Sequence, residues 1–329
     1  MPASGLRWGG LSQELLTRVF GLLGTGSLPA ARATDHAGHC KAAGPLARDL
    51  VRQLSSPDWA ARLRAVRLLR KLAHRLDGSS NMVATALASL VADTDGRVRE
   101  AAVNALGAFA SGVSGTAALE ALVPQLCNFD DFVRTAAVAA FAAIANAGHG
   151  STVGGEAIKQ LSADRPEVRT AAAEVLSNLG TAVAAPDVYL EALFPRLEDT
   201  HPAVRYATLK ALRKLAARGA GAVVLVVADC MQRDSEPGIR QAAAVAVAQL
   251  AMPGDVQALA ALRVVMADTA WSVRKAAVEA VGVLAVDGDA AACKALAARL
   301  ELTEEHSLVR RAAEESRRRI MRTRLPHAR

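Results

Sequence analysis

One stretch of the sequence, residues 93–110 (DTDGRVREAAVNALGAFA), recurs in degenerate form along most of the chain. Its most constant feature is Arg99, which follows Val98 and precedes small residues at Ala101, Ala102 and Ala105. Equivalent arginines, here called register arginines, follow one another at intervals of 34–37 residues, taken as differences between successive positions. They are Arg62, Arg99, Arg134, Arg169, Arg205, Arg240, Arg274 and Arg310. A regular period of this length predicts a repeat architecture in which each unit packs on its neighbours.

The residues after each register arginine are spaced as on one face of a helix. Small residues, mostly alanine, stand two, three and six positions after it, and longer apolar residues stand seven and ten positions after it. Another apolar segment, such as 87–93 or 122–128, precedes each unit. We therefore predict an all-α fold, an alpha-alpha superhelix of about eight two-helix repeats, in which the alanines let neighbouring helices approach closely.

A short polar turn separates the two helices of each repeat. Prolines at positions 166, 202 and 237 fall three residues before a register arginine, where the first turn of a helix accepts proline. Residues 146–156 (NAGHGSTVGGE) form the longest interruption between repeats, and we interpret them as a flexible linker because they lack the ending of a phosphate-binding loop. In most repeats an acidic or amide residue stands six positions before the arginine: Asp93, Asn128, Asp199, Asp234, Asp268 and Glu304.

Together these features resemble the HEAT repeats, an armadillo-like solenoid family. Its units combine an apolar helix, an Asp-containing turn and a second helix that opens with Val-Arg-x-Ala-Ala. The resemblance covers about residues 46–317. It implies a structural ladder between neighbouring repeats, paired as Asp93/Arg134, Asn128/Arg169, Asp199/Arg240 and Asp234/Arg274. The residues expected in the ladder are Asp93, Arg99, Arg134, Arg169, Asp199, Arg205, Asp234, Arg240, Asp268 and Arg274.

Residues 1–45 precede the repeats and contain a short amphipathic segment, which we predict to cap the first repeat. Over residues 8–45 the chain also resembles an F-box, whose first helix reads Leu-Pro-x-Glu-Leu-Leu followed by Ile/Val-Phe and Leu. Ser12 stands at the position of that proline. The resemblance implies binding to the adaptor of a cullin-RING ubiquitin ligase. The candidate adaptor-binding residues are Leu11, Leu15, Leu16, Val19 and Phe20.

Four potential metal ligands, Asp35, His36, His39 and Cys40, lie in this N-terminal segment. No second cluster completes a tetrahedral site, so the sequence predicts a polar loop here and no metal. The four cysteines are far apart and unpaired in spacing, which is typical of a reducing compartment, and we expect a cytoplasmic or nuclear protein. The longest apolar run, residues 222–228, is far too short to span a membrane.

The net charge of +7 is concentrated near the C-terminus. Residues 310–329 hold eight arginines and two glutamates, so six of the seven net charges lie there, and the rest of the chain is nearly neutral. Aromatic residues make up 3% of the chain, which is a poor supply for base stacking. We therefore expect nucleic acid to be bound, if at all, through the basic tail, residues 318–329.

The exposed face of each second helix is predicted one, five, eight and nine positions after the register arginine. That face is basic in the first repeat and again in the fifth. Such basic patches suit an acidic partner. Trp59 and Trp271 occupy equivalent turns, where we expect them to pack over the neighbouring turn. The candidate protein-binding residues are Arg67, Arg70, Lys71, Tyr206, Lys210, Arg213, Lys214 and Lys275.

No pairing of carboxylates, no nucleophile with a base and no set of metal ligands recurs in the repeat frame. The sequence therefore predicts a protein that is not an enzyme and needs no cofactor. The favoured function is a helical-repeat scaffold that binds another protein through its second-helix surface. The alternatives are an F-box-type substrate receptor of a ubiquitin ligase and a nucleic-acid-associated adaptor that uses the basic tail.

Overall fold

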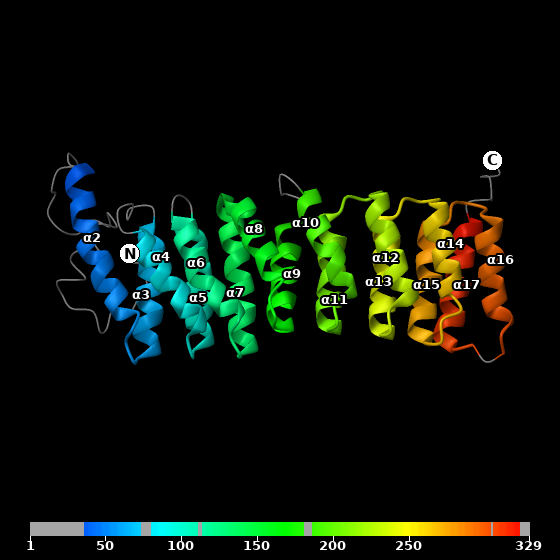
Figure 1. The fold of residues 1–329 in the computed structure, drawn as a ribbon, viewed down its shortest axis with the longest axis horizontal. Coiled ribbons are helices and arrows are strands. Elements are labelled where there is room, and N and C mark those ends of the chain that lie inside the picture. The colour runs from blue at the N-terminus through cyan, green and yellow to red at the C-terminus, as the bar shows by residue number, and fades with distance from the viewer. Residues whose placement is uncertain (1–35, 74–79, 111–113, 181–185, 304, 323–329) are drawn as a thin grey trace, which may run out of the picture. The chain divides into compact units, whose positions relative to one another are not determined.

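The computed structural model describes residues 36–73, 80–110, 114–180, 186–303 and 305–322. These residues form helices and connecting turns without a β-strand, and this confirms the predicted all-α solenoid of two-helix repeats. The described residues form two compact units, and the division between them falls after Glu156, within helix α8. Figure 1 shows the helices in chain order.

In unit 1 the second helices of successive repeats pack side by side, α3 on α5 and α5 on α7 (Figure 1). The first helices α4 and α6 pack on one another in the same way. A 3₁₀ turn, Leu90–Ala92, extends α4, and a π-helical turn, Ala145–His149, joins α7 to α8. The helices are α2 (His36–Gln53), α3 (Trp59–Leu72), α4 (Ser80–Ser89), α5 (Gly96–Phe109), α6 (Ser114–Leu126), α7 (Asp131–Ile144) and α8 (Gly150–Gln160).

In unit 2 the second helices form a longer row, in which α9, α11, α13, α15 and α17 each pack on the next. The 3₁₀ segment Phe194–Glu198 extends α10. The helices are α9 (Pro166–Leu179), α10 (Pro186–Leu193), α11 (Pro202–Leu215), α12 (Gly221–Arg233), α13 (Pro237–Leu250), α14 (Val256–Val265), α15 (Trp271–Leu284), α16 (Ala290–Glu301) and α17 (Ser307–Arg322).

The second helices begin where the sequence places their starting signals. Pro166, Pro202 and Pro237 are the first residues of α9, α11 and α13, where a missing N–H breaks no helical hydrogen bond. In α5 and α7, Asp95 and Asp130 instead accept hydrogen bonds from backbone amides two residues later. The turns before these five helices therefore start the helix with a proline or an acidic cap, whereas α15 begins at Trp271 after Ala270 with neither.

The core follows the predicted register. The residue three positions after each register arginine is fully buried in all eight repeats, and it is alanine in seven of them. The exception is Thr208, whose hydroxyl donates to the carbonyl of Val204 at 2.8 Å. A small residue at this position lets the second helices approach closely, and the longer side chains seven and ten positions after the arginine fill the space between layers.

Two segments differ from the sequence prediction. His36, His39 and Cys40 belong to α2 and not to a polar loop, because the alanine-rich stretch continues the helix anchored by buried Leu46 and Leu50. Asp35 lies outside the described residues.

The segment predicted as a flexible linker, residues 146–156, is helical as well. Gly148 absorbs the kink with φ +107°, and α8 then buries Val153, Ala157 and Leu161 at four-residue spacing. The many glycines conceal this short apolar pattern. At the other end, α17 continues to Arg322 and buries Ile320, so residues 318–322 of the predicted tail are helical.

Candidate protein-binding surface

Five of the eight register arginines hold successive turns together through ion pairs. The Nη1 atom of Arg169 donates to the carbonyls of Ala163 and Asp164 in its own turn, at 2.9 and 2.8 Å. Its Nε and Nη2 atoms donate to both carboxylate oxygens of Asp199 in the next repeat, at 2.7 and 2.8 Å. The guanidinium of Arg169 therefore joins two turns with four hydrogen bonds. The pairs of this ladder are Arg62–Asp93, Arg169–Asp199, Arg205–Asp234, Arg240–Asp268 and Arg274–Glu305.

The ladder runs in the opposite direction to the one expected from the family resemblance. The predicted pairs were wrong, because each arginine of the observed ladder contacts the acid of the following repeat and not that of the preceding one. The Nη1 edge is held by the arginine's own turn, so the remaining edge faces the next turn. Glu305 supplies the final carboxylate, whereas Glu304 lies outside the described residues.

The carboxylates of Asp199 and Asp268 remain ionised although their side chains are largely buried. Burial opposes ionisation of Asp199, but hydrogen bonds from Arg169 and from a backbone amide outweigh it and lower the pKa of Asp199 below its usual 3.8. At Asp268 the hydrogen bond from Arg240 is the largest influence, and the pKa is again lowered. The same contacts raise the pKa of both guanidinium groups. The ladder is therefore a charged and hydrogen-bonded structural feature.

One link of the ladder is absent in unit 1. Arg99 holds the carbonyls of Asp93 and Thr94, but its partner position in the next turn is occupied by Asn128. The Oδ1 atom of Asn128 accepts from the amide of Asp130 at 3.0 Å, just as Asp93 accepts from the amide two residues after it. Its second polar atom is a nitrogen donor, which cannot accept from a guanidinium.

Arg134 does not enter the ladder as predicted either. Its Nη2 atom donates to Asp131 of its own helix at 2.8 Å, and its Nη1 atom holds the carbonyls of Asn128 and Phe129. Among the residues that the structure describes, neither Arg99 nor Arg134 therefore forms an ion pair with an acid of the following repeat.

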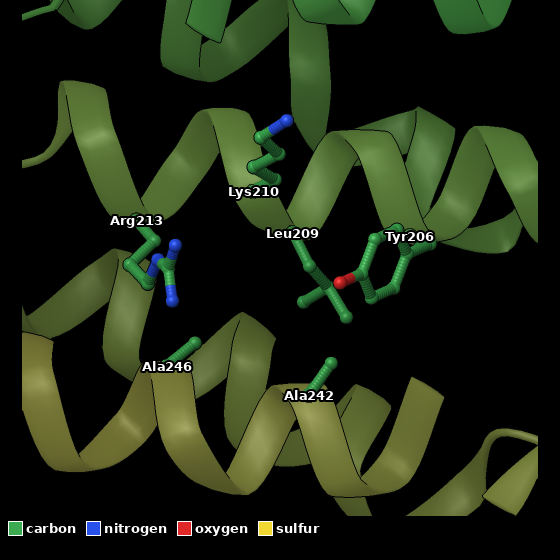
Figure 2. A pocket seen from close by; sticks show the side chains of 6 residues that line it. All are labelled: Tyr206, Leu209, Lys210, Arg213, Ala242 and Ala246. Atoms are coloured by element: carbon green, nitrogen blue, oxygen red, sulfur yellow. The ribbon is translucent and has the colours of Figure 1, made fainter. Parts of the chain in front are cut away.

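A second feature, a small groove, opens on the second-helix row of unit 2 between α11 and α13. Tyr206, Leu209, Lys210 and Arg213 of α11 form one wall, and Ala242 and Ala246 of α13 form the other. Figure 2 shows Arg213 reaching from α11 toward Ala246, while the ring of Tyr206 lies beside Leu209. The groove has a volume of about 140 Å³. It combines apolar walls with two cationic side chains.

The residues predicted to bind a protein partner lie on the second helices α3, α11 and α15. Tyr206, Lys210 and Lys214 are exposed, Arg213 is half-buried against the groove, and Lys275 is half-buried beside Glu279, with which it forms an ion pair at 2.6 Å. In unit 1, Arg67, Arg70 and Lys71 are exposed on α3. The structure thus brings four candidates together around α11 and three along α3.

The register rule for exposure fails at the eighth position after the arginine. Ser177 and Gly282 occupy it in α9 and α15, and both are buried. This position faces the next second helix, as the approach of Gly282 to Ser316 of α17 shows. Arg213 stays accessible because Ala242 and Ala246 opposite it are small, so its long side chain reaches out along the groove.

A family model described as HEAT repeats matches residues 47–142, 156–248, 190–263 and 224–317. These ranges cover more than half of the chain. The chain belongs to the HEAT-repeat family.

Among solved structures, two engineered proteins from the Northeast Structural Genomics Consortium are similar to this HEAT-repeat chain. The first is 22% identical over 92% of this chain and 88% of its own, with a TM-score of 0.45. The second is 21% identical over 72% of this chain and 96% of its own, with a TM-score of 0.32. No curated protein matches the sequence.

The missing link in the HEAT-repeat ladder allows a direct test. Changing Asn128→Asp should give Arg99 a carboxylate partner and raise the free energy of unfolding by about 1–2 kcal/mol. The measurement is urea denaturation followed by circular dichroism at neutral pH. Asn104→Asp on the exposed face of α5 adds the same charge away from the ladder, and it should leave stability within about 0.5 kcal/mol. Equal effects of the two variants would show that Arg99 gains no partner.

The two turn tryptophans pack over neighbouring turns, as predicted. The guanidinium of Arg97 lies 3.6 Å from the ring centroid of Trp59, and the ring of His306 stacks on Trp271 with centroids 4.3 Å apart. Both contacts join a turn to the turn of the following HEAT repeat.

Sequence reasoning missed two exposed aromatic side chains. Phe129 in the turn before α7 is 88% exposed, and Phe132 in the first turn of α7 is 72% exposed. Arg99 lies 5.9 Å from the ring centroid of Phe132. The available signal for Phe132 was its place two positions before the register arginine, where the other repeats have no aromatic residue. Exposed phenylalanines are candidate contact residues for a protein partner.

The described residues include only some of the other predicted sites. Leu11, Leu15, Leu16, Val19 and Phe20 lie outside the described residues, so the F-box resemblance stays a prediction. Within the described ranges no three His, Cys, Asp or Glu side chains gather as a metal site would require, and no helix has both the length and the apolar character needed to cross a membrane. Burial raises the pKa of the Cys230 thiol to about 12, which suppresses a nucleophilic thiolate there.

Proposed function

We propose that this HEAT-repeat protein is a non-enzymatic scaffold that binds another protein through its second-helix surface. In unit 2 the principal contact would be the groove between α11 and α13. The observation that carries the proposal is the combination there of Tyr206, Lys210 and Arg213 beside two alanines. Tyrosine and arginine are enriched among residues that dominate binding energy, and apolar surface that a partner can cover supplies the rest.

The scaffold itself supports this function. The second helices of unit 2 are held in a row by buried small residues and by four ladder pairs, so the surface residues keep fixed positions. A preorganised surface loses little conformational entropy when a partner binds. The residues of the exposed face differ from repeat to repeat while the buried positions stay alike, which suits recognition of one partner.

The test is quantitative affinity purification from cells with the full chain as bait. The variant Arg213→Glu with Lys214→Glu should lose about tenfold or more of its specific partner, since it reverses charges that face the partner. The control Arg233→Glu with Lys294→Glu changes the net charge equally on the first helices α12 and α16. It should retain the partner. Recovery of the same partners at the same level by both variants would overturn the proposal, provided that both unfold at the wild-type temperature.

A further inference from the structure

We infer that the groove between α11 and α13 binds a short acidic protein segment that carries one aromatic or aliphatic anchor. The inference rests on the proposed function and names the chemistry of the partner. It follows from three observations: the charges around the groove, the width of the basic surface, and the size of the groove.

The cations at the groove have no acidic partner among the residues that the structure describes. Lys210, Arg213 and Lys214 form no ion pair, and the neighbouring face of α13 presents the neutral residues Gln241 and Gln249. Four other cations of the unit form ion pairs within their own helices. Those pairs are Arg233–Asp229, Lys275–Glu279, Arg311–Glu315 and Arg318–Glu314. The α11 cluster therefore offers an anion three neighbouring cations that no described carboxylate of the unit neutralises.

The basic surface is about one repeat wide. Five positions after the register arginine, the row from α9 to α17 presents Glu174, Lys210, Val245, Glu279 and Glu315. Neighbouring helices lie roughly 8–10 Å apart. A nucleic acid crossing the row would place phosphates beside these glutamates, whereas a short acidic segment would avoid them. The charge pattern thus favours a peptide over an extended polyanion.

The groove also limits the length of the segment. Tyr206 and Arg213 are seven residues apart on α11, which corresponds to about 10 Å along the helix and to about three residues of extended chain. A cavity near 150 Å³ accommodates a benzene-sized group, so this groove of about 140 Å³ has room for one side chain. The anchor would lie between Tyr206 and Ala242, and the carboxylates would lie toward Arg213 and Lys214.

The experiment is fluorescence anisotropy with the full chain and a labelled peptide of one phenylalanine followed by a glycine and four glutamates. A peptide with lysine in place of glutamate, a peptide with alanine in place of phenylalanine, and a labelled single-stranded DNA are compared with it. We expect the acidic peptide to bind, the lysine peptide not to bind, and the alanine peptide to bind about tenfold more weakly. The double variant Arg213→Ala with Lys214→Ala should lower the affinity for the acidic peptide at least about tenfold. The control Arg233→Ala with Lys294→Ala should change that affinity less than about twofold.

The inference is overturned if the acidic and lysine peptides bind with equal affinity. It is also overturned if the DNA binds more tightly than the acidic peptide and if the variant Arg213→Ala with Lys214→Ala lowers the affinity for the DNA. Failure here is distinguishable from failure of the proposed function. A cellular partner lost by the charge-reversal variant, without any binding of the acidic peptide, refutes the acidic segment and leaves the scaffold function standing. Binding of the peptide without any cellular partner that depends on Arg213 and Lys214 would refute the scaffold function at this surface.

Discussion

Replacing Asp199→Asn should lower the free energy of unfolding by about 2–3 kcal/mol at neutral pH. The amide keeps the shape of the turn, because its oxygen can still accept from the backbone amide of His201, which lies 3.0 Å from Oδ1. It removes the carboxylate that accepts two hydrogen bonds from Arg169 and leaves that guanidinium facing a donor. The natural sequence contains the same arrangement at Asn128. Asp199→Asn removes a link of the ladder and Asn128→Asp adds one, so the two variants test the same kind of link in opposite directions.

The effect of Asp199→Asn should depend on pH. The folded-state pKa of Asp199 is lowered, so its contribution is fully present above the usual value of 3.8 and is lost as the pH falls through the lower folded value. Urea denaturation at a series of pH values should therefore show the wild type and the variant converging below about pH 4. The exposed pair Lys275–Glu279 provides the control, and Glu279→Gln should cost less than about 0.5 kcal/mol. Equal losses in the two variants would mean that the ladder pair acts as an ordinary surface pair.

The second large effect is expected from Gly282→Ala in α15. A Cβ atom at Gly282 would lie 3.1 Å from Cα and 2.6 Å from Cβ of Ser316 in α17, and it would also clash with the Ser316 Oγ atom. That hydroxyl already donates to the carbonyl of Val278 at 3.2 Å, so the side chain has little freedom to move. We expect a loss of about 2 kcal/mol, because the cost of overpacking exceeds the helix-forming gain of about 1 kcal/mol.

Gly107 is the matched control, since it occupies the same register position in α5. A Cβ atom there would meet the Cβ of Ala143 at 3.3 Å, which requires a shift of a few tenths of an ångström. Gly107→Ala should leave the free energy of unfolding within about 1 kcal/mol of the wild type, or raise it. Both variants are compared by thermal and urea denaturation of the full chain. If Gly282→Ala proved as stable as Gly107→Ala, the close contact between α15 and α17 would not be rigid.

Some features were predictable from the sequence because they depend on local spacing. The register arginines, the prolines at 166, 202 and 237 and the buried third position all lie within one helix or its own turn. The exposure of Lys210 and Lys214 followed from the same helical period. By contrast, Ser177 and Gly282 were placed on the wrong face, because the neighbouring second helix covers them.

By itself the sequence determined the repeat, its two helices, its alanine core and the residues that carry charge, since each follows from a short-range period. The tertiary structure decided which charged side chains form ion pairs with one another. The spacing of Asp93 does not say whether Arg62 or Arg134 will reach it, and the folded chain places Arg62 there. The packing of α13 against α11 likewise decided that Arg213 stays accessible beside Ala246. These outcomes depend on distances between repeats, which arise only when the helices have packed.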